Sequence, residues 1–410
     1  MFKSSHKTII PFIVLTFPLI IDCLNGILRG STGEENSIIG ILFRGLIIGY
    51  SFINGALKSE FILKSIYYSI LYIITQIILG SFSFSCIIFL IKILYAFFVL
   101  VILLKNKKFE DIENTINFAL LYGVGASIVL ITSFIFGFGY SAYVDGGFGT
   151  KGFFIAMNDV GLTILILNGL SCLYYQKTRK KLYLLYTLIM FTGSCLIGSM
   201  AGFFGSAILF IGIFTSIILF RFSNYRSNIK EKVIILLISF VIITFLIQTF
   251  VTIILEDAYL SKKYSDLSET ILSISGRGIL IDGALYAIKT MNPLNMLFGL
   301  GKNYDVLIGN YVGGGKDFLK SAEVDPLDLY GTFGLILTIL ILYYPIKTFI
   351  TSLYYYSKYK SIDNYWIFII TTIFIIHSIY GGHAFTSPLS YSYYILCIYI
   401  MVKYKQLKFK

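Results

Sequence analysis

The sequence predicts an all-α, polytopic membrane protein with about twelve transmembrane helices and one long extracytoplasmic loop that contains short amphipathic helices. The 410-residue chain is 57% hydrophobic and only 13% charged, and its mean hydropathy is +0.83. A soluble domain has about 45–50% apolar and about 25% charged residues. A soluble chain of this length could not bury so many long apolar runs in one core, so the composition excludes a soluble fold.

Apolar segments recur along the whole chain. A helix needs about 20 mostly apolar residues to cross the hydrocarbon core of a bilayer. Twelve segments are candidates, at residues 9–28, 38–56, 61–80, 82–104, 115–138, 153–175, 182–198, 202–220, 233–255, 332–354, 365–380 and 386–402. The chain therefore divides into transmembrane helices at 1–255, a long loop at 256–331, and three further helices with a basic tail at 332–410.

Positive charges orient these helices. The net charge is +12, and most of the 33 Lys and Arg residues fall in alternate short loops, on the side that also holds both termini. Because Lys and Arg accumulate in cytoplasmic loops, we expect both termini in the cytoplasm. The basic charge therefore orients helices and does not indicate nucleic acid binding. This orientation places the 256–331 loop on the extracytoplasmic side.

The 256–331 loop carries signals of local structure. Loops of this length are usually functional or disordered. Ser275 fits an N-cap, and apolar residues recur at helical spacing from Leu280 to Met291. Asn292-Pro293 ends this pattern. We expect an amphipathic helix here that lies on the membrane surface or caps the helix bundle.

Two basic residues, Arg44 and Lys92, lie inside predicted spans. A cation within the bilayer costs a few kcal/mol or more and usually faces a partner or a cavity. Arg44 lies about one and a half to two turns from the outer end of its predicted helix. That depth suits an anionic, lipid-linked phosphate in the outer leaflet. The alternative is that either side chain extends to the membrane interface.

A glycine-rich loop at residues 140–152 holds Lys151, and Asn158 and Asp159 enter the next predicted helix. A Lys and free backbone N–H groups at a helix start form an anion site. Lys151 and Asn158 are therefore candidate substrate-binding residues. An ordinary loop at the membrane entry is the alternative.

Arg277 lies between two glycines in the long loop. Arginine binds phosphate oxygens through two parallel hydrogen bonds, and flanking glycines allow a ligand to approach closely. Arg277 is therefore a candidate for holding a phosphate group. A surface salt bridge with Asp282 is the alternative.

Three carboxylates, Glu323, Asp325 and Asp328, lie at the start of the tenth predicted helix. Like charges close to a low-dielectric boundary favour the protonated form of a carboxyl group, which suits acid–base chemistry. Glu323 or Asp325 is a candidate general base toward a sugar hydroxyl, and Asp328 is a candidate substrate-binding residue. Acidic residues also stabilise helix N-termini, which accounts for some of the three without any chemistry.

His383 lies in the last predicted extracytoplasmic hairpin and is a further candidate for contact with substrate. A hydrogen-bonded histidine at the membrane interface is the alternative. The five cysteines and three histidines match no metal-binding spacing. The sequence therefore predicts no metal and no cofactor.

Several of these segments resemble the Wzy-type polymerases of bacterial O-antigen, capsule and exopolysaccharide, which share a fold with O-antigen ligases. The most specific are SGR at 275–277 followed by NPLNMLFGLG, and EVDPLDLYGTFGL at 323–335. GTKGFF at 149–154, Asn158 and the GGH that ends at His383 also fit. The turn after the seventh span departs from the pattern, because Met200 and Ala201 stand where such polymerases often have a basic residue.

The resemblance implies a membrane glycosyltransferase in the bacterial cytoplasmic (inner) membrane. The donor would be a growing glycan on undecaprenyl pyrophosphate, and the acceptor a second lipid-linked oligosaccharide repeat unit. Arg277, with Lys151 and Arg44, would hold the leaving pyrophosphate, and Glu323 or Asp325 would deprotonate the acceptor hydroxyl. Membrane lipids would surround the chain, and a chain-length regulator protein is a possible partner.

Two other functions fit part of the pattern. An O-antigen-type ligase is expected to carry a catalytic histidine in the long loop, but residues 256–331 contain none, and carboxylates stand at the corresponding end. A flippase or other transporter suits twelve spans, but transporters seldom carry such a long outer loop, and paired interrupted helices are absent from the sequence pattern. Polymerisation is therefore the favoured function.

Overall fold

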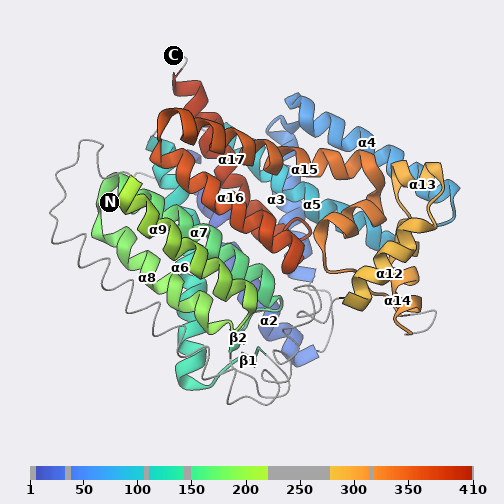
Figure 1. Cartoon of the computed structure of the whole chain (residues 1–410), viewed down its shortest axis with the longest axis horizontal. Helices are drawn as coiled ribbons and strands as arrows, with labels where there is room; N and C mark the ends of the chain where they lie inside the picture. The colour runs from blue at the N-terminus through green and yellow to red at the C-terminus, as the bar shows by residue number, and fades with distance from the viewer. Residues whose placement is uncertain are drawn as a thin grey trace.

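The computed structural model describes residues 6–32, 38–105, 110–142, 149–219, 278–313 and 318–408, and these are mostly helical (Figure 1). A short hairpin of β1 (Tyr140–Ser141) and β2 (Thr150–Gly152) pairs antiparallel. The helices are α1 (His6–Leu15), α2 (Pro18–Thr32), α3 (Ile38–Ile53), α4 (Glu60–Ile78), α5 (Phe84–Leu104), α6 (Glu110–Phe136), α7 (Met157–Thr178), α8 (Lys181–Leu196), α9 (Met200–Leu219), α12 (Gly278–Lys289), α13 (Pro293–Phe298), α14 (Lys302–Tyr311), α15 (Asp325–Tyr359), α16 (Ile362–Tyr380) and α17 (Pro388–Lys408).

The fold is that of a helical, multi-pass membrane protein, as the sequence predicts. Within the described residues, seven helices are long and apolar enough to cross a bilayer. They are Ile9–Leu28, Glu60–Ile78, Phe84–Leu104, Ile112–Phe136, Met157–Thr178, Asp325–Tyr359 and Ile362–Tyr380. Shorter apolar helices occupy Ile39–Ile53, Lys181–Leu196 and Gly205–Ser216. The predicted span at 233–255 lies outside the described residues, so the number twelve stays a prediction.

Helix α7 is the centre of the bundle. Its residues 160–174 are all buried, as expected for a helix that is apolar around most of its circumference. It packs against α6, α8, α9, α16 and α17 (Figure 1). The first turn of α7 holds Asn158 and Asp159, so these polar side chains belong to the most enclosed helix of the protein.

Helices α12, α13 and α14 form a small unit beside α4 and α15, at one end of the molecule (Figure 1). We call residues 278–313 and 318–324 the α12–α14 unit. It has its own apolar core, which includes Leu280, Ala284, Ala287, Tyr304 and Ile308. The predicted amphipathic helix is therefore confirmed as α12, with Asp282, Tyr286 and Lys289 exposed on its other face. Asn292 follows its end and caps α13, because its side chain accepts the N–H of Asn295.

The α12–α14 unit is joined to α15 by close backbone contact. The Leu300 N–H donates to the Gly331 carbonyl (2.8 Å), and the Gly301 N–H donates to the Thr332 carbonyl (3.1 Å). An added Cβ at Gly299 would lie 2.2 Å from the Thr332 carbonyl oxygen, so only glycine fits there. These contacts coincide with an interruption of α15 at Gly334, where φ is 72°. Residues 299–301 and residues 330–334 therefore hold the α12–α14 unit against α15.

Candidate functional site

Ionisable side chains from several helices lie within electrostatic range of one another inside the helix bundle. Asp22 of α2 interacts electrostatically with Arg44 of α3 and with Asp159 of α7. Asp159 also interacts with Lys92 of α5, and with His383 in the turn between α16 and α17. We call Asp22, Arg44, Lys92, Asp159 and His383 the charge cluster. Because unpaired charges are costly within a membrane, opposite charges that gather in this way offset part of that cost.

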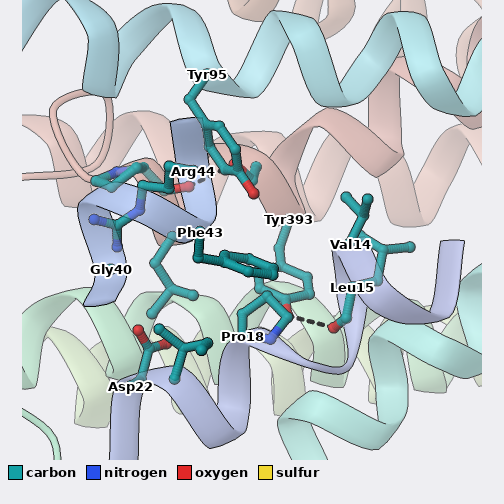
Figure 2. A pocket seen from close by; sticks show the side chains of 13 residues that line it. Val14, Leu15, Pro18, Asp22, Gly40, Phe43, Arg44, Tyr95 and Tyr393 are labelled. Atoms are coloured by element: carbon teal, nitrogen blue, oxygen red, sulfur yellow. Dashed lines mark hydrogen bonds between the residues drawn. The ribbon is translucent and has the colours of Figure 1, made fainter. Parts of the chain in front are cut away.

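A small cavity lies beside two members of the charge cluster. Its volume is about 20 Å³, and Pro18, Asp22, Phe43, Arg44, Tyr95 and Tyr393 are among its lining residues. Figure 2 shows the Arg44 guanidinium directed toward the Asp22 side of this cavity. The Tyr122 hydroxyl donates to Asp22 (3.1 Å) and fixes the carboxylate. A cavity of this size holds about one water molecule, so a larger anion would have to displace Asp22 or widen the space.

The two cations lie at similar depth in their helices. Arg44 follows the first residue of α3 by about 9 Å along the helix axis, and Lys92 follows that of α5 by about 12 Å. Both side chains are half-buried. Arg44 thus lies at the predicted distance from the start of its helix, while its depth in a membrane stays a prediction. Lys92 lies within electrostatic range of Arg44, which repels it, and of Asp159, which attracts it.

The turn that carries His383 is fixed by Asp325. One Asp325 carboxylate oxygen accepts the N–H of His383 (2.8 Å), and the other accepts the N–H of Phe385 (2.9 Å). The Asp325 side chain is 1% exposed. Asn158 supports the same turn, since its side-chain amide donates to the Gly381 carbonyl (3.4 Å). Residues from α7, α15 and the α16–α17 turn therefore form one polar structure.

The other two predicted carboxylates lie close to this turn. Asp328 is 5% exposed and accepts the N–H of Ala322 (2.8 Å), so it stabilises the segment that precedes α15. Glu323 is half-buried and has a left-handed backbone, with φ of 56°. An added Cβ at Gly382 would lie 2.5 Å from the Glu323 carbonyl oxygen, so the two turns are in direct contact. The structure thus brings Glu323, Asp325 and His383 together.

The structure does not place the other predicted phosphate-binding residues in the charge cluster. Lys151 is half-buried on β2, in a hairpin whose Tyr140 hydroxyl donates to the Gly26 carbonyl (2.9 Å). Among the described residues, no ion pair connects Lys151 to the charge cluster. Arg277 lies outside the described residues, so its role stays a prediction.

Asp22 and Asp159 were not among the predicted site residues. A carboxylate inside an apolar segment is as costly as a cation there, and that signal could have identified Asp22. Asp159 stands next to Asn158 and could have been chosen for the same reason. Their partners could not have been found from sequence spacing, because they lie on separate helices.

Comparison with known proteins identifies no relative: no protein-family model and no curated protein matches the chain. In the part of the chain that the structure describes, no group of three or more His, Cys, Asp and Glu side chains could hold a metal ion. The chemistry of the site must therefore be inferred from the charge cluster and the turns beside it.

Proposed function

We propose that this chain polymerises undecaprenyl-pyrophosphate-linked oligosaccharide repeat units on the extracytoplasmic face of the bacterial cytoplasmic membrane. The observation that carries the proposal is the charge cluster, in which two cations and two carboxylates lie beside a histidine inside a multi-pass bundle. Buried charges of this kind usually mark the path or the site of a polar substrate.

The cations suit the pyrophosphate of a lipid-linked donor. The lipid tail of such a donor would stay in the bilayer, while its phosphates would reach the depth of Arg44 and Lys92. Both cations already lie within electrostatic range of a carboxylate, Asp22 or Asp159. A pyrophosphate would replace those carboxylates as the counter-ion and would gain charge as the glycosidic bond to it breaks. Preorganised cations stabilise that developing charge.

The polar turns at the start of α15 and between α16 and α17 are suited to binding the sugars of the two lipid-linked substrates. Glu323, Asp325 and His383 lie where the α15 start meets the α16–α17 turn, and the charge distribution predicts that this end faces outward. An acceptor hydroxyl bound there would lie next to the base it needs. No nucleotide sugar is required, because the lipid pyrophosphate is itself the leaving group.

Deletion of the gene tests this proposal. In the deletion strain, single lipid-linked repeat units should accumulate on the outer leaflet, and long chains should disappear. A Lys92→Gln copy should fail to restore long chains, because it removes one cation from the charge cluster. A Lys105→Gln copy should restore them, because Lys105 is exposed at the other end of the same helix. Glycolipid extraction and leaflet-specific labelling measure both outcomes.

Other results would point elsewhere. Accumulation of repeat units on the inner leaflet would indicate a flippase. Long chains of normal length that fail to join their final lipid acceptor would indicate a ligase. Unchanged long chains in the deletion strain would exclude polymerisation.

A further inference from the structure

The backbone of His383 is held in an unusual conformation. Its φ is 61°, in the left-handed region, which costs a residue other than glycine about 1 kcal/mol or more and persists only where the surroundings impose it. Such strain in a protein often lies at a functional site. The preceding residue, Gly382, also has a left-handed φ of 64°. The chain therefore makes a tight turn at Gly382 and His383, and this turn sets the direction of the His383 side chain.

Three hydrogen bonds fix this turn. Asp325 accepts the His383 N–H (2.8 Å), and the His383 carbonyl accepts the N–H of Ser387 (3.1 Å) and the hydroxyl of Ser390 (3.4 Å). Both oxygens of Asp325 are thereby engaged with backbone N–H groups. Asp325 is also almost fully buried, so a sugar hydroxyl could not reach it without breaking the turn. Asp325 thus positions the turn and is poorly placed to serve as the base.

The imidazole of His383 has the surroundings of a general base. It is half-buried, its Nδ1 lies 3.5 Å from the Thr386 hydroxyl, and it interacts electrostatically with Asp159 and Asp325. The two carboxylates stabilise an imidazolium after the ring accepts a proton. Asp159 also interacts electrostatically with Arg44 and Lys92, so one carboxylate is within electrostatic range of both the cations and the histidine.

We propose that His383 is the general base of the polymerisation reaction and that Asp159 and Asp325 are its positioning residues. This inference rests on the proposed function. The acceptor hydroxyl gives its proton to the imidazole while its oxygen forms a bond to the anomeric carbon of the donor glycan. The bond from that carbon to the lipid pyrophosphate breaks, and the electron pair leaves on the pyrophosphate. The imidazolium then releases the proton to water.

The test uses the full-length protein, reconstituted in liposomes with a lipid-linked repeat unit. His383→Asn is the informative variant, because asparagine tolerates a left-handed backbone but cannot act as a base. We expect its kcat to fall about 100-fold or more, with an unchanged Tm. Lys105→Gln is the control, because Lys105 is exposed at the far end of α5 and outside the proposed site, and it should keep most of the activity.

A second variant tests the inference even if His383→Asn does not fold. Asp325→Asn leaves only one side-chain oxygen to accept the two N–H groups that fix the turn. We expect its kcat to fall about 10-fold or more with an unchanged KM, because the base is displaced while substrate binding stays intact. An active His383→Asn variant, or an Asp325→Asn variant with wild-type kcat, would overturn the assignment while polymerisation by the wild type stands. A folded wild type that forms no polymer would instead refute the proposed function.

Discussion

At the residue scale, the charge cluster combines side chains that are costly when they stand alone. A buried ion pair gains little over an apolar core, but the loss of one partner leaves the other charge unpaired and costs about 3–5 kcal/mol. Arg44 and Lys92 on one side, and Asp22 and Asp159 on the other, are formally balanced. An anionic substrate could therefore replace one of the two carboxylates as the counter-ion of the cations.

Asp305 permits a test of buried charge away from the cluster. It lies on α14 and interacts electrostatically with Tyr72 of α4 and Cys86 of α5, and burial raises the pKa of its carboxyl to about 7. Above pH 7 the folded protein must bury an ionised group that the unfolded chain leaves in water. This destabilisation shrinks as pH falls from 7 toward the ordinary aspartate pKa, because the folded form then binds the proton first.

We therefore predict that Asp305→Asn stabilises the protein at pH 8, by about 2–4 kcal/mol. The gain should decrease steadily as pH is lowered to 5, as measured by thermal unfolding in detergent. Asp282→Asn is the control, because Asp282 is exposed on α12 and its change should have little effect at any pH. A lower Tm for Asp305→Asn at pH 8 would contradict the prediction.

The sequence identifies single residues better than their partners. Arg44 could be predicted because a cation inside an apolar segment has few explanations. The bond from Asp325 to the His383 N–H spans 58 residues along the chain, and no local pattern encodes it. The carboxylates of the α15 start were predicted as bases or helix-stabilising groups, whereas Asp325 and Asp328 in fact bind backbone N–H groups of neighbouring turns.

At the element scale, the α12–α14 unit depends on glycines that let backbones approach. Gly309 lies in α14, and an added Cβ there would lie 1.6 Å from the Phe318 carbonyl oxygen. Gly49 lies in α3, and an added Cβ there would meet nothing within 4 Å. A close backbone contact therefore requires glycine at position 309, whereas no such contact requires it at position 49.

We predict that Gly309→Ala destabilises the protein by about 1–3 kcal/mol through overpacking. Gly49→Ala should be neutral or stabilise it by up to about 1 kcal/mol, because alanine is the better helix former. Thermal unfolding measures both, and protease cleavage near residue 318 should increase only in Gly309→Ala. Equal stability of the two variants would show that the segment after α14 does not pack as described.

A helix could be predicted from the sequence where one of its faces is apolar and the other is polar. The spacing from Leu280 to Met291 correctly predicts α12, and Asn292-Pro293 correctly predicts its end. The short helices α13 and α14 were not predicted individually, because their contacts lie with α15 and α12 and not within their own sequences. Helix α15 begins at Asp325, before its predicted span at 332, because its first turn is too polar for a hydropathy pattern to include.

At the scale of the whole molecule, one enclosed helix and one lateral unit define the proposed site. The buried helix α7 carries Asn158 and Asp159 at its start, and α15 carries Asp325 at its own start beside the α12–α14 unit. The α16–α17 turn joins them through His383. Hydropathy predicts that these helices cross a membrane, but only tertiary packing shows that their starts share one polar region.

The central claim is tested most directly by supplying purified protein in liposomes with a lipid-linked repeat unit and no nucleotide sugar. We predict a ladder of products that grow by one repeat unit, with release of one lipid pyrophosphate for each bond formed. The ladder should vanish in Lys92→Gln and persist in Lys105→Gln. Folded wild-type protein that leaves every repeat unit single would contradict the claim.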